Sequence, residues 1–131
     1  MIVLTLRTDK PQAEVGLFEE DMRLAYETWE AHRQLAETIH AKIKDVLLAG
    51  GKSLGDIDAV VCYKGPGSFT GLRIGLSVAN ALAYGLGVPI VGVQGEATWI
   101  TRGQQRLANG INDRAVLPEY GAPVRITKPK K

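Results

Sequence analysis

The segment Gly65-Pro66-Gly67-Ser68-Phe69-Thr70-Gly71-Leu72-Arg73-Ile74-Gly75 decides the fold of this chain. It follows the apolar stretch Ile57 to Tyr63, which predicts a strand covered on both faces. It leads into residues 69–86, which predict a helix with Ser68 as its N-cap. A strand, a glycine-rich turn and a helix N-terminus can bind an anion, because the free backbone N–H groups and the helix dipole point the same way.

A candidate anion-binding loop follows from this geometry. Ser68 and Thr70 could add hydroxyl donors and Arg73 a positive charge. The segment is not a Walker A loop, because no lysine follows its last glycine, and Thr70 stands where a dinucleotide-binding motif has its third glycine. The alternative is a tight turn whose glycines serve geometry and close packing. The candidate loop residues are Gly65, Gly67, Ser68, Thr70 and Arg73.

The residue pattern of the helix after this segment predicts that the helix contacts a partner protein. Its smallest residues recur at four-residue spacing, and charge is almost absent between Ile74 and Val93. A helix that is apolar all round must be covered all round, and a large apolar patch on a small protein typically marks an interface. The alternative is that the other helices of the chain cover it completely. The candidate interface comprises Gly71, Gly75, Ala79, Ala83, Leu72, Leu76, Leu35 and Ile39.

The rest of the chain predicts a mixed sheet with helices packed on it. Short apolar stretches at 2–6, 13–18 and 24–29 predict an antiparallel meander. Apolar residues at helical spacing between 35 and 47 predict an amphipathic helix that ends at Gly50-Gly51. Residues 88–93 predict a further strand, and residues 95–108 a weaker helix.

The resulting order is β-β-β-α-β-α-β-α, which predicts an α/β protein with one mixed five-stranded sheet. This order matches the ribonuclease-H-like single lobe of the actin/sugar-kinase/Hsp70 fold. We expect residues 1–114 to form this lobe and residues 115–131 to form a tail. Pro118 and Pro123 argue against a helix there, so residues 115–126 are expected to lie extended along the lobe, with 127–131 mobile.

The amino-acid composition excludes several classes of function. The chain has 131 residues and is 45% hydrophobic, as in an ordinary globular domain. Lys plus Arg is 16 and Asp plus Glu is 14, so the formal net charge of +2 provides no overall field for nucleic acid. The single cysteine, Cys62, excludes an internal disulfide framework and a cysteine-based zinc finger. Without a membrane-spanning stretch or a signal peptide, the expected location is the cytoplasm.

The sequence offers few candidate catalytic groups. His32 and His40 are two turns apart, which is too far for one metal site on one helix face. Ser68 and Ser77 have no visible His/Asp partners. We therefore expect no catalytic residue, no metal and no cofactor.

Residues 65–75, the small-residue helix and Val88-Pro89-Ile90-Val91-Gly92-Val93 together resemble the TsaB (YeaZ) family. His32-Arg33-Gln34-Leu35 is similar to the family's H-S-E-x-L helix start, and Leu54-Gly55-Asp56-Ile57-Asp58 to its L-x-D-I-D turn. The resemblance covers residues 1 to about 95. It implies an inactive relative of the TsaD enzyme, a scaffold that supports N6-threonylcarbamoyladenosine synthesis on tRNA.

The resemblance also implies the partners. They are TsaD-like and TsaE-like proteins, or a second copy of the chain, bound through the helices named above. Contact with tRNA would be indirect, through the complex.

Three departures from the family pattern stand out. Arg7-Thr8-Asp9 replaces the D-T-S turn after the first strand, and arginine cannot coordinate a cation. Gln94-Gly95-Glu96 replaces S-S-L after the last strand. The chain passes from its third helix almost at once to Pro118-Glu119-Tyr120 and Val124-Arg125, which resemble the family's closing P-x-Y-x-R segment, so we expect a short form of the family without its second lobe.

Two other hypotheses compete with the scaffold. One is a nucleotide-dependent enzyme of the wider fold, either a phosphotransferase or a glycoprotease-like peptidase. The other is a self-associating module unrelated to tRNA. Complex formation with a TsaD-like protein and an ATPase assay would separate them.

Overall fold

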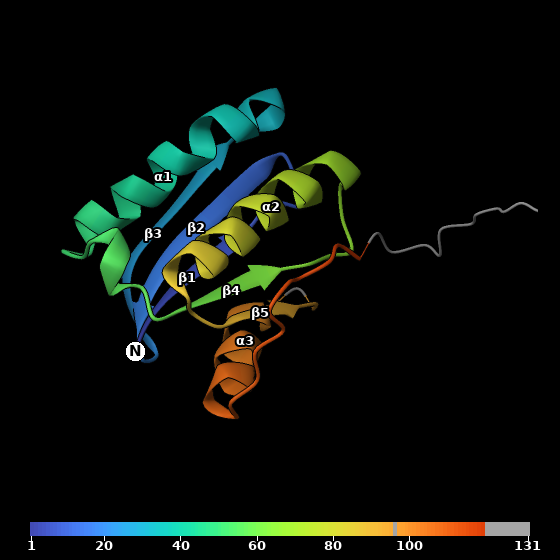
Figure 1. Ribbon diagram of the computed structural model, residues 1–131. Helices are drawn as coiled ribbons and strands as arrows, with labels where there is room; N and C mark the ends of the chain where they lie inside the picture. Colours follow the sequence, from blue (N-terminus) through green and yellow to red (C-terminus); the bar gives the residue numbers. More distant parts are fainter. Residues whose placement is uncertain (96, 120–131) are drawn as a thin grey trace, which may run out of the picture.

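The computed structural model describes residues 1–95 and 97–119. They form one five-stranded sheet with helices on both faces (Figure 1). The element order and the mixed sheet confirm the predicted fold class. The strands are β1 (Ile2–Arg7), β2 (Gln12–Glu19), β3 (Met22–Glu30), β4 (Ala59–Tyr63) and β5 (Ile90–Val93). The helices are α1 (Leu35–Ala49), α2 (Phe69–Leu86) and α3 (Trp99–Ala108), with short 3-10 turns η1 (His32–Gln34) and η2 (Leu54–Asp56).

The strands lie in the spatial order β3-β2-β1-β4-β5. The pairs β1–β2 and β2–β3 are antiparallel, as a meander requires. The pairs β1–β4 and β4–β5 are parallel, with Leu4 beside Val60 and Val60 beside Ile90. Parallel neighbours need helical crossovers, and α1 and α2 supply them.

Each face of the sheet has its own apolar core. In β4, Val60 and Cys62 point to the face covered by α1 and α2, while Val61 and Tyr63 point to the face covered by α3. The prediction that this strand is covered on both faces is therefore confirmed. Figure 1 shows α1 and α2 side by side on one face and α3 under β4 and β5 on the other.

The predicted boundaries are wrong by a few residues where side chains cap the elements. The strand expected from Ile57 begins at Ala59, because Asp58 binds the first residue of β1 instead of pairing within the sheet. The Asp58 carboxylate accepts the Ile2 N–H at 2.7 Å, and the Asp58 N–H donates to the Ile2 carbonyl. Asp56 closes a capping box with Ser53. The helix expected from residue 95 begins at Trp99.

Side chains from the C-terminal part cap the outer edge of β5. The Ile90 N–H donates to Asn112, and the Gly92 N–H donates to Asp113 at 2.8 Å. The Arg106 guanidinium donates to the Gly92 carbonyl and to both carboxylate oxygens of Asp113. Burial opposes ionisation of Asp113, but these hydrogen bonds outweigh it and hold the pKa of Asp113 below its ordinary value. The edge is thereby protected from pairing with another strand.

Residues 115–119 pass from α3 along the sheet toward the start of α2 (Figure 1). Val116 is buried, with its N–H and carbonyl both bonded to the Asn80 side-chain amide of α2. The Glu119 N–H donates to the Lys64 carbonyl at 2.7 Å. The remainder of the predicted wrap, 120–126, and the expected mobile end, 127–131, lie outside the described residues. The domain division at residue 114 stays a prediction.

Candidate partner interface and glycine-rich corner

The glycine-rich segment packs against the end of β1. The Ser68 N–H donates to the Asp9 carbonyl at 2.9 Å, and the Thr8 hydroxyl donates to the Gly71 carbonyl at 2.8 Å. An added Cβ at Gly67 would lie 3.1 Å from the Asp9 Cα, and one at Gly75 would lie 2.8 Å from the Thr8 Cγ2. The glycines therefore have a packing role, since they allow α2 to approach the β1 corner closely.

Arg7 and Asp9 form a buried ion pair at this corner. The distances are 2.7 Å from Arg7 Nε to Asp9 Oδ1 and 3.1 Å from Nη2 to Oδ2. The guanidinium carbon also lies 4.0 Å from the centre of the Tyr63 ring, in cation–π geometry. The Asp9 carboxylate is thus held by a cation of the same chain. This pair is the structural consequence of the Arg7-Thr8-Asp9 departure noted in the sequence.

The structure does not gather the predicted anion-binding residues into one cradle. The Ser68 N–H is taken by Asp9, and the Ser68 side chain accepts the Gly71 N–H as the predicted N-cap. Gly65 packs against the Glu119 carbonyl with a φ of +124°. Thr70 and Arg73 instead line a cavity between α1 and α2, together with Ala36 and His40.

The predicted partner interface needs correction. The small-residue ridge of α2 faces the chain's own sheet: Ala79 is 0% and Ala83 2% exposed, and Gly71 and Gly75 contact Thr8. The other residues of the predicted set, Leu72, Leu76, Leu35 and Ile39, are also buried within the chain. Small side chains let a helix approach its own sheet as well as a partner helix, so the spacing alone could not separate the two.

The outward face of α2 was marked by its few polar residues. Thr70, Arg73 and Ser77 recur at helical spacing and are exposed, as is Ala81. Between them, Ile74, Val78 and Leu82 are only partly buried against the core. These polar positions were the available indication of which face points away from the sheet.

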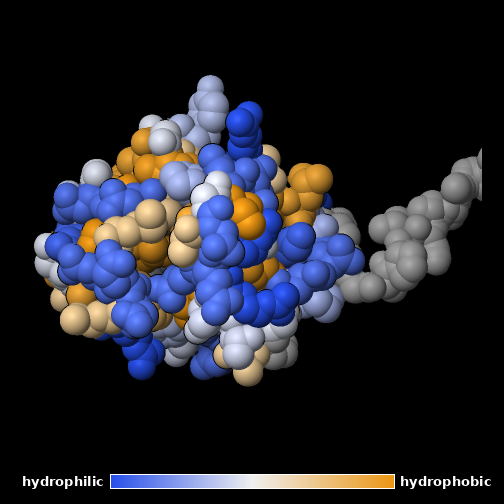
Figure 2. Space-filling view, turned by 90° about the horizontal axis from the view of Figure 1, so that it is seen from below, coloured by the Kyte–Doolittle hydropathy of each residue, from blue (hydrophilic) through white to orange (hydrophobic). Residues whose placement is uncertain are grey.

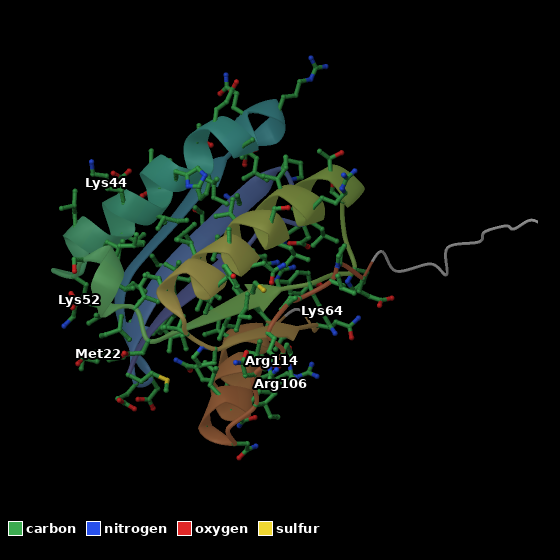
Figure 3. The ribbon with its side chains drawn as sticks, in the orientation of Figure 1. Met22, Lys44, Lys52, Lys64, Arg106 and Arg114 are labelled. Atoms are coloured by element: carbon green, nitrogen blue, oxygen red, sulfur yellow. The ribbon has the colours of Figure 1, made fainter. Side chains whose placement is uncertain are left out.

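A groove runs between α1 and α2, with mixed polarity at the end beside Thr70 and Arg73 and mainly apolar walls at the other end. It consists of two cavities that share His40, one of about 340 Å³ beside Ile74 and Val78 and one of about 450 Å³ beside Leu47 and Leu82. Leu48, 70% exposed, and Leu54, 44% exposed, stand at its open end. Lys44 and Lys52 line the same end (Figure 3). We call this surface, from Ala36 and Thr70 to Leu54, the α1–α2 groove.

Other candidate chemical groups are accounted for locally. Burial raises the pKa of the Cys62 thiol, so this side chain stays protonated at neutral pH. Tyr26 donates to Glu14, and burial is the largest cause that raises the pKa of its hydroxyl. Within residues 1–95 and 97–119, no three His, Cys, Asp or Glu side chains are grouped to hold a metal ion. Within the same ranges, no helix is both long and apolar enough to cross a membrane.

The sheet order and the placement of the helices define a protein of the actin-like, ribonuclease-H-like fold class. A solved structure described as YeaZ from Pseudomonas aeruginosa superposes with a TM-score of 0.69 at 29% identity, over 82% of this chain and 50% of that one. The Thermus thermophilus RuvC structure in complex with a Holliday junction, at 17% identity and a TM-score of 0.53, shares the fold alone.

Residues 29–109 match the family model described as TsaD, tRNA N6-adenosine threonylcarbamoyltransferase. The chain belongs to this family and is TsaB/YeaZ-like, as the sequence resemblance indicated. It is 32% identical to tRNA threonylcarbamoyladenosine biosynthesis protein TsaB of Escherichia coli over 124 residues. That alignment covers 87% of this chain and 51% of the relative, so the chain spans about half of that protein's length. A tRNA N6-adenosine threonylcarbamoyltransferase of Geotalea uraniireducens is 48% identical over 63 residues, 48% of this chain and 18% of the relative.

Proposed function

We propose that this chain acts in N6-threonylcarbamoyladenosine synthesis on tRNA, as a non-catalytic subunit that binds a TsaD-like protein. The similarity to TsaB over most of the chain supports the pathway. The α1–α2 groove supports the mode of action, because its end beside Leu48 and Leu54 is an open apolar surface on a small protein and such surfaces mark interfaces. A TsaE-like protein completes the proposed assembly.

The proposed contact uses the groove rather than the buried ridge. Leu48 and Leu54 are exposed at one end, and Ile74 and Val78 form part of the wall at the other. Lys44 and Lys52 give that first end a basic rim, so the matching partner surface is apolar with acidic residues at its margin.

The non-catalytic role has support at the β1 corner. Asp9 is the acidic residue at the position where the resembling family has its D-T-S turn, and both of its carboxylate oxygens are bonded to Arg7. A carboxylate held in this way is poorly placed to act as a base or as a cation ligand. The proposal therefore assigns the chemistry to the partner.

The test is to mix the full chain with the TsaD-like protein of the same organism and to measure the mass of the complex by light scattering. We expect a complex that Leu48→Glu weakens about tenfold or more, because the new carboxylate would have to be desolvated in the interface. Leu117→Glu is the matched control, since Leu117 is 76% exposed and does not line the groove. Equal weakening by both variants would show that the groove is not the interface.

The competing hypotheses have distinct outcomes in the same experiment. A homodimer that does not bind the TsaD-like protein would favour the hypothesis of a self-associating module. ATP hydrolysis or peptide cleavage by the chain alone, lost in Asp9→Asn, would favour an enzyme and overturn the proposal.

A further inference from the structure

One face of α3 consists of side chains that can donate hydrogen bonds. Arg102, Gln105, Arg106 and Asn109 are three or four residues apart and so lie on the same side of the helix. They line a polar cavity of about 350 Å³ together with Lys64, from the end of β4, and residues 92–94 of β5 and its following loop. No acidic residue occurs in α3. We call these five residues of the cavity, Lys64, Arg102, Gln105, Arg106 and Asn109, together with Arg114, which directly follows the Arg106 partner Asp113, the basic end surface.

Most of the cations on this surface form no salt bridge with another residue that the structure describes. Arg106 is paired with Asp113 at 2.8 Å, but the side chains of Lys64, Arg102 and Arg114 form no salt bridge with another described residue. Arg102 donates to the Gln94 carbonyl, which positions its guanidinium at the cavity. The stem of Lys64 packs over Gly92, where an added Cβ would lie 3.1 Å from the lysine Cδ.

Basic side chains gather at this end of the sheet, although the formal net charge of the chain is only +2. Lys64, Arg106 and Arg114 lie beside α3 and the end of β4 (Figure 3), whereas Glu20 and Asp21 of the β2–β3 turn line a separate cavity together with Gln104 and Gln105 of α3. Figure 2, seen from the α3 side of the molecule, shows a mostly hydrophilic surface on which apolar side chains form separate patches. This surface suits a polar, anionic ligand better than an apolar partner.

Further basic residues follow this place in the sequence. The Glu119 N–H bonds to the Lys64 carbonyl, and the twelve residues 120–131 follow Glu119 in the sequence. This stretch contains Arg125, Lys128, Lys130 and Lys131 and no acidic residue.

The topology favours ligand binding at the same place. The helix that follows β4 lies on one face of the sheet and the helix that follows β5 lies on the other (Figure 1). In open α/β sheets, ligands bind outside the carboxyl ends of strands where such a switch occurs. Lys64 follows the end of β4, and Gln94 follows the end of β5.

We propose that the basic end surface binds the phosphodiester backbone of RNA. Lys64, Arg102 and Arg114 contact phosphates through charge, and Gln105 and Asn109 add neutral donors without base specificity. That the RNA is tRNA rests on the proposed function. The contact is direct and made by this chain, in addition to any contact made through a complex.

The test measures binding of a fluorescently labelled, unmodified tRNA transcript to the full chain by anisotropy at several salt concentrations. We expect affinity to fall with salt, as phosphate contacts require. Lys64→Gln/Arg102→Gln should weaken binding about tenfold and reduce the salt slope by about one for each lost contact. Lys42→Gln/Arg33→Gln is the control for net charge, because it removes one lysine and one arginine charge from α1 and η1, away from the cavity; it also breaks the Lys42–Glu27 salt bridge, which concerns folding rather than the cavity.

Folding is checked separately, by the melting temperature of each variant. Lys64→Gln alone provides a second test, since the Lys64 side chain forms no hydrogen bond or salt bridge with another described residue, and its loss should still weaken RNA binding. Equal weakening by the two double variants would overturn the proposal, because net charge would then be the only cause. Loss of binding on deletion of residues 127–131, with no effect of Lys64→Gln/Arg102→Gln, would also overturn it.

Competitors separate the possible sources of the anion. Excess unlabelled RNA should displace the labelled transcript, whereas ATP and poly-glutamate at equal charge should not. Displacement by ATP would indicate a small-nucleotide site, and displacement by poly-glutamate an acidic protein partner; either result overturns the proposal. Because no TsaD-like protein is present, failure here leaves the proposed subunit function intact, and failure to bind TsaD leaves the RNA result intact.

Discussion

The side chain of Thr8, at the end of β1, occupies the space that any side chain at Gly75 of α2 would need, and its hydroxyl bonds to the Gly71 carbonyl one turn earlier. Two segments more than sixty residues apart in sequence are thereby locked together. This close packing depends on Gly71 and Gly75 of α2, which have no side chain, and on the small side chain of Thr8, which follows β1.

Gly75→Ala should destabilise the fold despite the higher helix propensity of alanine. The new Cβ would overlap the Thr8 side chain, and overpacking of this kind costs about 1–3 kcal/mol in the free energy of unfolding. Gly85→Ala is the control, because nothing lies within 4 Å of its Cβ position and the substitution should stabilise by about 0.5–1 kcal/mol. Urea denaturation measures both. The explanation would be wrong if Gly75→Ala remained equally costly in a Thr8→Ala background.

Ala79→Glu should unfold the chain or lower its melting temperature strongly. Ala79 is fully buried between α2 and the sheet, and an unpaired carboxylate there has a large desolvation penalty. The four-residue spacing of small side chains predicts a partner interface at this residue, where the same substitution would leave the fold intact. Ala81→Glu introduces the same side chain on the exposed face of the same helix and should stay folded. Equal melting curves for the two variants would contradict the buried position of Ala79.

Val116→Ala should lower the free energy of unfolding by about 1–3 kcal/mol, because it removes buried methyl groups that pack over Gly92. Leu117→Ala, at a position that is 76% exposed, should change it by less than about 0.5 kcal/mol. Deletion of residues 115–131 should cost a few kcal/mol, whereas deletion of 127–131 should be nearly neutral. Equal thermal stability of the full chain and of residues 1–114 would show that the segment does not stabilise the lobe.

The ion pair between Arg106 and Asp113 should make stability depend on acidic pH. Because the pKa of Asp113 is lower in the folded chain than its ordinary value of 3.8, its contribution is present above pH 3.8 and is lost as the pH falls through the folded-state pKa. In Asp113→Asn this component should be absent, so the stability difference between wild type and variant should shrink as the pH falls from 6 toward 3. Chemical denaturation across this pH range measures it. A constant difference would show that the carboxylate charge is not the stabilising feature.

The sequence by itself determined the order of the elements, the strand buried on both faces and the Ser68 cap. These features depend on local patterns: a short apolar run bounded by polar turns, apolar residues at helical spacing, and a hydroxyl before a helix. It also indicated the family, because the segment from Gly65 to Gly75 is both long and unusual. Each of these can be recognised without knowing what lies nearby in space.

Only the tertiary structure decided which face of α2 meets the sheet, where the Thr70 and Arg73 side chains point, and that Arg7 binds Asp9. A helix that is apolar on most sides has no local preference for one face, so the direction of the Gly71–Ala83 ridge depends on Thr8 and the sheet beneath it. The basic end surface likewise brings together Lys64, which follows β4, and Arg102 of α3. Their charges do not stand out in the sequence, because the acidic residues of the chain almost balance the basic ones in the net charge. Net charge and periodicity are properties of the chain, whereas burial and charge clustering arise only when distant segments are packed against one another.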